Sequence, residues 1–396
     1  MYKLYCRVYQ NTFRTGSVAL PWRRPSRLGG YKALVALLRD RGINSVLIVT
    51  DKGLTALGLH EELVQTITQS GIATSVYDNT AQNPTIDNIE EALVLYKAEE
   101  CTAIIALGGG SPMDCAKGVG ARVARPKKSV ESMRGLYKVL LKMPLFIAIP
   151  TTAGSGSETT VAAVVVDSRT GEKFAINDTA LIPHYVLHDP RLTIKLPPAI
   201  TATTGMDALC HAVEAYIGHS NTCRTELDAI KAVRLIFNNL HTAYQDGNNL
   251  QARTNMQKAA YLAGAAFTRA YVGNIHAISH TLSGQYDTPH GLANAVIMPY
   301  VLDVYGKTIE KRLWELAIAA GIAGLETPKN IASRQFIDTI RKMNREMNIP
   351  DKITDLKLYD IPKLANHALK EANPLYPVPV IFGYNDMVRV YHKLLV

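Results

Sequence analysis

The sequence has no run of about 18 apolar residues, the length that a membrane-spanning helix needs. Its first residues, MYKLYCRVYQNTFRTGS, are too often interrupted by polar and charged side chains to form the apolar segment of a signal peptide. We therefore predict a cytoplasmic protein. With 396 residues, of which 47% are hydrophobic and 19% charged, the chain can form two domains of about 200 residues each.

Cysteine is scarce, and its placement argues against two structural roles. The five cysteines are widely separated, and no two of them form a C-x-x-C pair. Such a pattern suggests neither a disulfide framework nor a thiolate zinc site. We predict reduced and mostly buried thiols. The residues are Cys6, Cys101, Cys115, Cys210 and Cys223.

Basic residues are in excess, with a net charge of +9, but long basic runs with interleaved aromatic residues are missing. The two richest clusters, RRPSR at 23–27 and RVARPKKS at 122–129, are short. Nucleic-acid-binding surfaces usually combine clustered basic residues with aromatic side chains. We therefore expect these clusters to be solvated loops, and we expect no nucleic-acid or membrane partner.

Short β-rich runs alternate with helical patterns up to about residue 195. Such alternation is typical of a mainly parallel sheet flanked by helices. The predicted strands are 45–50, 73–78, 102–107, 145–150 and 160–167, and the predicted helices cover about 54–69 and 86–99.

The pattern changes after the double proline Pro197–Pro198, beyond which long helical patterns rich in Ala, Leu and Lys continue to the C-terminus. Prolines at such a change favour a domain boundary. We predict an α/β domain at residues 1–195 and an all-helical domain at residues 196–396. Binding sites are common in the cleft between two such domains.

A glycine-rich turn, GGGS at 108–111, separates an apolar strand from a helix that Pro112 can start at its first position. Glycines let a ligand approach the backbone, and a helix N-terminus attracts phosphate groups. The pattern is neither G-x-G-x-x-G nor a Walker loop, and a tight turn would also use glycines. A second loop of Gly, Ser and Thr, PTTAGSGSE at 150–158, supports a nucleotide site.

Asp51 directly follows the predicted strand 45–50. A carboxylate in that position can bind a ribose diol and would repel a 2′-phosphate, which favours NAD over NADP. By itself, however, such an aspartate is more often a simple helix cap. In the common dinucleotide fold the acidic residue follows the glycine loop, whereas here it precedes it.

Histidine and aspartate recur at helical spacing in the second half of the chain. Asp207 and His211 are four residues apart, as are His276 and His280, so each pair can lie on one helix face. His290 follows in a turn with a proline and a glycine. One carboxylate with several imidazoles suits Fe(II) or Zn(II) in a site with an open position. A metallohydrolase could use the same ligands to activate water.

Six ordered motifs together resemble those of the iron-containing (group III) alcohol dehydrogenase family, over residues 28–396. The motifs are VTDKGL, NPT at 83–85, ALGGGSPMDCAKG, IPTTAGSGSE, ATTGMDALCHAVEAY and HAISH with PHGLANAVIMP. The resemblance implies an α/β domain that binds NAD(P), followed by a helical domain that carries the metal. It also implies a homo-oligomer, either a homodimer or a larger assembly.

The resemblance also implies roles for individual residues. The family's metal ligands correspond to Asp207, His211, His276 and His290. His280 corresponds to a nearby histidine that does not bind the metal and lies beside the nicotinamide, and we expect it to relay a proton. The expected NAD(H)-binding residues are Asp51, Asn83, Gly108, Gly109, Gly110, Ser111, Asp114, Thr151, Thr152 and Ser155.

The sequence departs from the family pattern after His280, where T-L-S-G-Q replaces the common P-L-G followed by an apolar residue. The family's early F-G-x-G loop is also missing, and LGGYKAL at 28–34 stands in its place. We expect hydride transfer between NAD(H) and a small alcohol or aldehyde. Glycerol dehydrogenase and dehydroquinate synthase share the fold, so a polyol dehydrogenase or a related lyase is the alternative.

Overall fold

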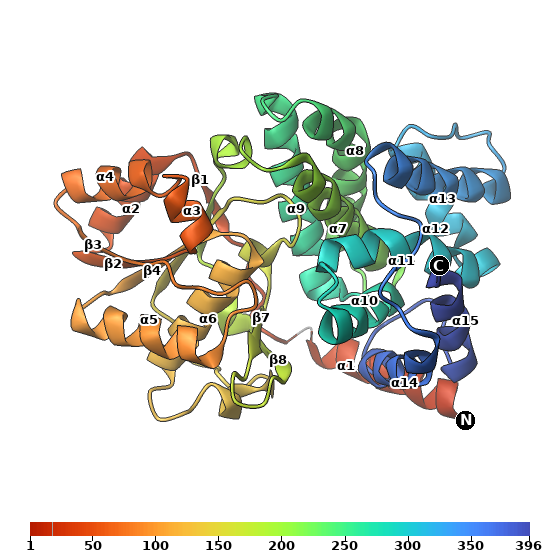
Figure 1. The fold of residues 1–396 in the computed structure, drawn as a ribbon, viewed down its shortest axis with the longest axis horizontal. Coiled ribbons are helices and arrows are strands. Elements are labelled where there is room, and N and C mark those ends of the chain that lie inside the picture. Colours follow the sequence, from red (N-terminus) through yellow and green to blue (C-terminus); the bar gives the residue numbers. More distant parts are fainter. Residues whose placement is uncertain (18) are drawn as a thin grey trace. The chain divides into compact units, whose positions relative to one another are not determined.

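The computed structural model describes residues 1–17 and 19–396, and the chain divides into two compact units (Figure 1). The α/β unit comprises residues 21–152 and 156–193. The helical unit comprises residues 1–17, 19–20, 153–155 and 194–396. No described helix is both long and apolar enough to span a membrane.

A six-stranded parallel sheet forms the centre of the α/β unit, with the order β1-β9-β6-β4-β2-β3. The inner strands β4 and β6 consist almost wholly of buried residues, as expected for a parallel sheet covered on both faces. In sheet order, the strands are Ser26–Leu28, Tyr185–Leu187, Leu145–Pro150, Ala103–Gly108, Ser45–Val49 and Ala73–Tyr77.

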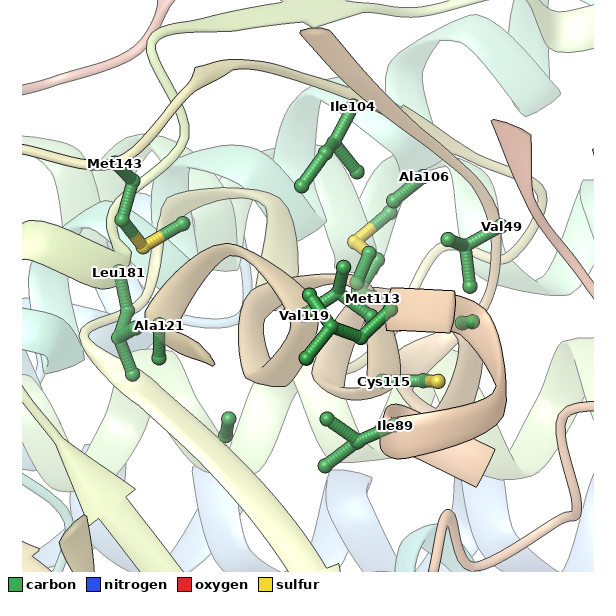
Figure 2. Packing of buried hydrophobic residues seen from close by; sticks show 14 of the residues in the cluster. Val49, Ile89, Ile104, Ala106, Met113, Cys115, Val119, Ala121, Met143 and Leu181 are labelled. Carbon is green, nitrogen blue, oxygen red and sulfur yellow. The ribbon is translucent and has the colours of Figure 1, made fainter. Parts of the chain in front are cut away.

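Helices cover both faces of this sheet. The side chains of α2 and α4 pack on one face, and those of α5 and α6 pack on the other. Figure 2 shows the layer formed by α5 and α6, where Met113, Cys115 and Val119 of α6 lie among residues of β2, β4 and α5. The helices are α2 (Tyr31–Asp40), α3 (Lys52–Ala56), α4 (Glu61–Gln69), α5 (Ile86–Ala98) and α6 (Gly110–Ala124).

Two predicted elements of this unit differ from the structure. The helix predicted at 54–69 is divided into α3 and α4, because Gly58 adopts a positive φ of 69° between them. The strand predicted at 160–167 corresponds to β7 (Ala162–Val166), which belongs to a separate sheet with β8 (Lys173–Asn177) and β5 (Gly135–Leu136). Its burial alternates along the strand, so one of its faces is buried and the other is only partly covered.

The helical unit is built around α7 (Pro198–Ile217), whose residues are buried without a break from Gly205 to Ile217. Gly205 permits close packing, because a Cβ atom there would lie 2.3 Å from Leu240 Cδ1 of α8. The other helices are α1 (Tyr2–Ser17), α8 (Cys223–Gln245), α9 (Leu250–Ala270), α10 (Asn274–Tyr286), α11 (His290–Tyr305), α12 (Glu310–Ala319), α13 (Lys329–Glu346), α14 (Ile361–Ala372) and α15 (Tyr384–Leu394).

Helix α1 belongs to the helical unit, although residues 1–195 were predicted as one α/β domain. Its Cys6 is buried against Val378 and Ile381. The Arg7 guanidinium donates hydrogen bonds to the carbonyl oxygens of Val378 and Pro379. These partners lie far along the chain, so the sequence of α1 alone gave no sign of this packing. Near the predicted boundary, Pro198 is the first residue of α7, and the units divide between residues 193 and 194.

Candidate metal centre and cofactor loops

Helix α7 supplies the first two members of a polar cluster within the helical unit. Asp207 and His211 are one turn apart, and both are buried. The Nδ1 atom of His211 lies 3.9 Å from Asp207 Oδ2. The Phe267 ring of α9 stacks on the His211 imidazole with a centroid distance of 4.1 Å. Packing therefore holds this imidazole in place.

Helices α10 and α11 supply the other two members. His276 is buried in the first turn of α10, and His290 is the first residue of α11. Donor atoms of Asp207, His211, His276 and His290 all lie within 4.8 Å of one another. Three helices thus bring together the four residues expected to bind a metal.

Two further side chains, outside the expected ligand set, contact this cluster. Glu214, also on α7, lies 2.6 Å from Nδ1 of His276 through its Oε2. Asn294 of α11 is fully buried, and its Nδ2 donates to Asp207 Oδ1 at 2.7 Å. The same nitrogen lies 3.2 Å from His276 Nε2 and 3.0 Å from His290 Nε2. Acceptor atoms from three helices therefore converge on one point.

The electrostatics of the cluster suit a divalent cation. Burial, with the neighbouring histidines His211, His290 and His280, lowers the pKa of His276 well below its usual value, so this imidazole is neutral. Burial raises the pKa of Glu214 to about 7, although hydrogen bonds from Gly273, Ile275 and His276 oppose this shift. Burying two carboxylates with only neutral imidazoles around them would be costly unless a cation compensated their negative charge. Oxygen and nitrogen donors of this kind fit iron or zinc.

His280 lies beside the cluster on α10. Its ring stacks on that of His290 with a centroid distance of 5.1 Å. Its Nδ1 lies 2.5 Å from Glu371 Oε1 of α14, and the hydroxyl of Tyr376 donates to the same oxygen at 2.8 Å. Burial tends to raise the pKa of Glu371, but His280 and the hydrogen bond from Tyr376 hold it below the usual value. Glu371 thereby orients the His280 ring.

The glycine loop lies in the α/β unit, at the end of β4 and the start of α6. Gly108 has a φ of 155°, and a Cβ atom there would lie 2.5 Å from Pro112 Cγ, so only glycine fits. The helix begins at Gly110 with Gly109 as its N-cap, two residues earlier than the predicted start at Pro112. Its first N–H groups can bind a phosphate.

The second loop is divided between the units. Thr151 belongs to the α/β unit, and its N–H donates to the carbonyl of Gly108 at 3.1 Å. Thr152 contacts the glycine loop as well, since a Cβ atom on Gly109 would lie 3.4 Å from its Cγ2. Ser155 belongs to the helical unit. The two loops therefore meet at Thr151 and Thr152.

The remaining residues expected to bind NAD(H) already have protein partners in the α/β unit. Asp51 caps α3, accepting from Leu54 N–H at 3.0 Å. Asp114 accepts from the Ser157 hydroxyl and Val164 N–H, and burial raises its pKa. Asn83 Oδ1 accepts from Lys173, and the Ser111 hydroxyl donates to the carbonyl of Gln82. For Asp114, these bonds indicate that it holds β7 against α6.

The sequence had given no role to Glu214, Asn294 or Glu371. Helical spacing could have suggested the first two, because Glu214 follows His211 by three residues and Asn294 follows His290 by four. Glu371 lies 91 residues beyond His280, so no local pattern connects them.

Comparisons with known proteins agree with this architecture. Residues 27–190 match the family described as "Iron-containing alcohol dehydrogenase", and residues 201–395 match "Fe-containing alcohol dehydrogenase family, C-terminal". The 1,3-propanediol dehydrogenase of Klebsiella pneumoniae is 37% identical, over 92% of this chain and 91% of its own. The NAD-dependent methanol dehydrogenase of Bacillus methanolicus is 35% identical, over 87% and 90% respectively.

A solved structure of 1,3-propanediol oxidoreductase matches with a TM-score of 0.90 and 33% identity, covering 95% of this chain and 99% of that chain. The fold of the two units and the family matches across both therefore agree on the family of this chain. The chain belongs to the iron-containing alcohol dehydrogenase family, a family of metal-dependent oxidoreductases of alcohols and aldehydes.

Proposed function

We propose that this protein is a metal-dependent alcohol dehydrogenase and aldehyde reductase that transfers a hydride between NAD(H) and a small alcohol or aldehyde. The convergence of Asp207, His211, His276 and His290 within the helical unit carries the proposal. The relatives named above are alcohol and diol dehydrogenases, which favours this reaction over a lyase or a hydrolase.

The four residues would hold one Fe(II) ion, with Zn(II) as the alternative. Bound there, the ion would act as a Lewis acid on the substrate oxygen, while NAD(H) would supply or accept the hydride. Asn294 supports the centre by donating to Asp207. This hydrogen bond from a neutral amide orients the Asp207 carboxylate and leaves its negative charge for the metal ion.

The α/β unit would bind the cofactor. The N–H groups at the start of α6 suit the pyrophosphate, and Gly108 and Gly109 let it approach the backbone. Asp51 uses Oδ1 for its helix cap, and its second oxygen is suited to a ribose hydroxyl. The NAD-dependent relative in Bacillus methanolicus supports NAD over NADP.

His280 would move the proton. Glu371 accepts a hydrogen bond from Nδ1 of His280, so the imidazole can exchange a proton with substrate or water through its other nitrogen, Nε2. During alcohol oxidation, the hydroxyl proton passes to His280, and during aldehyde reduction it returns to the oxygen. An imidazole suits transfer near neutral pH.

Absorbance of NADH over time tests this function directly. Protein purified without oxygen and loaded with Fe(II) would be mixed with NADH and a panel of short aldehydes, including hydroxylated and anionic members. We expect NADH to be oxidised in proportion to the aldehyde supplied. A flat trace across the panel, with metal and NADH both bound, would contradict the proposal and favour another reaction on this fold.

A cytoplasmic homodimer, expected from the sequence and its resemblance, belongs to the same proposal. Sedimentation velocity of the purified protein measures its assembly, and a monomer at all concentrations would contradict the dimer.

A further inference from the structure

Glu214 is a buried carboxyl group whose three hydrogen-bond partners lie around the start of α10. Its Oε2 accepts from the N–H of Gly273 at 2.8 Å, and its Oε1 accepts from the N–H of Ile275 at 2.8 Å. The third partner is Nδ1 of His276, 2.6 Å from Oε2. Only 3% of the residue is exposed, so water does not compete for these bonds.

This arrangement determines which nitrogen of His276 carries a proton. Backbone N–H groups can only donate, so Glu214 acts as an acceptor at two of its three contacts. The short contact between Nδ1 of His276 and the same carboxylate is favourable when Nδ1 carries a proton and donates it in a hydrogen bond. A neutral imidazole has one N–H, so Nε2 then keeps its lone pair. That atom lies next to the acceptors of Asp207 and His290, around Asn294 Nδ2.

We propose that Glu214 is a positioning residue of the metal centre, which fixes the proton of His276 on Nδ1 and so presents Nε2 to the ion. The inference rests on the metal centre of the proposed function. Its basis is a carboxylate–histidine pair, an arrangement that in metal sites sets the tautomer and raises the basicity of the ligand.

The same carboxylate also joins two ligand-bearing helices. Glu214 lies on α7 with Asp207 and His211, and it binds the backbone from which α10 begins. Gly273 is required at this contact, because a Cβ atom there would lie 2.7 Å from Glu214 Oε1. Glu214 therefore sets both the ring of His276 and the position of its helix.

Metal affinity of a Glu214→Gln variant tests this role without relying on activity. Competition between the protein and a coloured chelator for Zn(II) measures the affinity, and circular dichroism confirms folding. We expect binding to weaken by about 10- to 100-fold, because glutamine cannot accept all three donors. Folded Glu214→Gln with wild-type affinity would overturn the inference.

Glu371→Gln is the matched control. It makes the same chemical change at a second carboxylate–histidine pair, with a contact of 2.5 Å, but His280 is outside the proposed ligand set. We expect Zn(II) affinity within about twofold of wild type. Equal losses in both variants would overturn a specific role for Glu214, because any carboxylate–histidine pair near the cluster would then have the same effect.

A measurement on the unaltered protein covers the case in which Glu214→Gln does not fold. Nitrogen-15 NMR of histidine-labelled, Zn(II)-loaded protein reports which ring nitrogen of His276 carries a proton. We expect protonated Nδ1, and a proton on Nε2 would overturn the inference. A wild-type protein that binds no metal would overturn both the metal centre and this role, whereas a wild-type-like Glu214→Gln overturns only the latter.

Discussion

Gly291 lies where α11 crosses α7, directly after the proposed ligand His290, and its replacement by alanine should loosen the metal centre. An added Cβ atom would lie 2.5 Å from the backbone oxygen of Thr203 on α7. It would also lie 3.4 Å from Cβ of Asp207. The obstacle is backbone, which cannot rotate away as a side chain can, so the two helices must separate.

The size of this separation follows from ordinary contact distances. Since such contacts begin near 3.4 Å, relieving a 2.5 Å approach requires a shift of about 0.9 Å. Metal–ligand distances tolerate only about 0.2 Å. Asp207 on α7 and His290 on α11 would then no longer fit one ion. We expect metal affinity to fall on the order of tenfold or more, and stability to fall by about 1–3 kcal/mol.

Competition for Zn(II) against a coloured chelator measures the affinity, and thermal unfolding measures the stability. Gly284→Ala is the control, because it makes the same change on α10 where nothing lies within 4 Å of the new Cβ. That variant should keep its metal affinity and gain up to about 1 kcal/mol of stability. Wild-type affinity in Gly291→Ala would refute the proposed placement of ligands on α7 and α11.

Three further changes test other parts of the site and fold. His280→Ala should keep its metal but lose roughly 100-fold in turnover, and metal loss would instead make His280 a ligand. Asp51→Ser retains a helix-capping side chain but removes the charge, so the preference for NADH over NADPH should fall by about tenfold; an unchanged ratio would exclude Asp51 from cofactor selection. His184 should destabilise the protein as pH falls. Burial, together with the charges of Arg23, Lys142 and Arg41, lowers the pKa of His184 to about 4 in the folded protein. Between pH 6.5 and 4, this histidine therefore binds a proton only in the unfolded chain, which favours unfolding. Urea unfolding should show up to about 3 kcal/mol lost in that window, and His184→Gln should lose less; equal losses would contradict the reasoning.

Most of the central sheet could be predicted from sequence, because the inner strands β2, β4 and β6 are buried, nearly continuous apolar runs. Strands β2, β3, β4 and β6 begin or end within one residue of their predicted bounds. Strands β1 and β9 have only three residues each, too few to form a recognisable pattern. Their place in the sheet depends on pairing with each other and with β6.

The proposed metal ligands were recognisable because helical spacing of four residues is local. Asp207 and His211 illustrate this, since one helix alone brings them together. The groups that orient the ligands depend on contacts between helices. Glu214 meets His276 only because the fold brings the start of α10 to α7, and Glu371 meets His280 because α10 and α14 pack together. Sequence spacing contains no information on such pairings.

Anaerobic titration of metal-stripped protein with Fe(II) tests the central claim most directly, when bound iron and aldehyde-dependent NADH oxidation are followed together. In the wild type, both should rise in parallel and saturate at one ion per chain, and in His276→Ala both should be lost. Activity without added metal, or an active and iron-replete His276→Ala protein, would contradict the account.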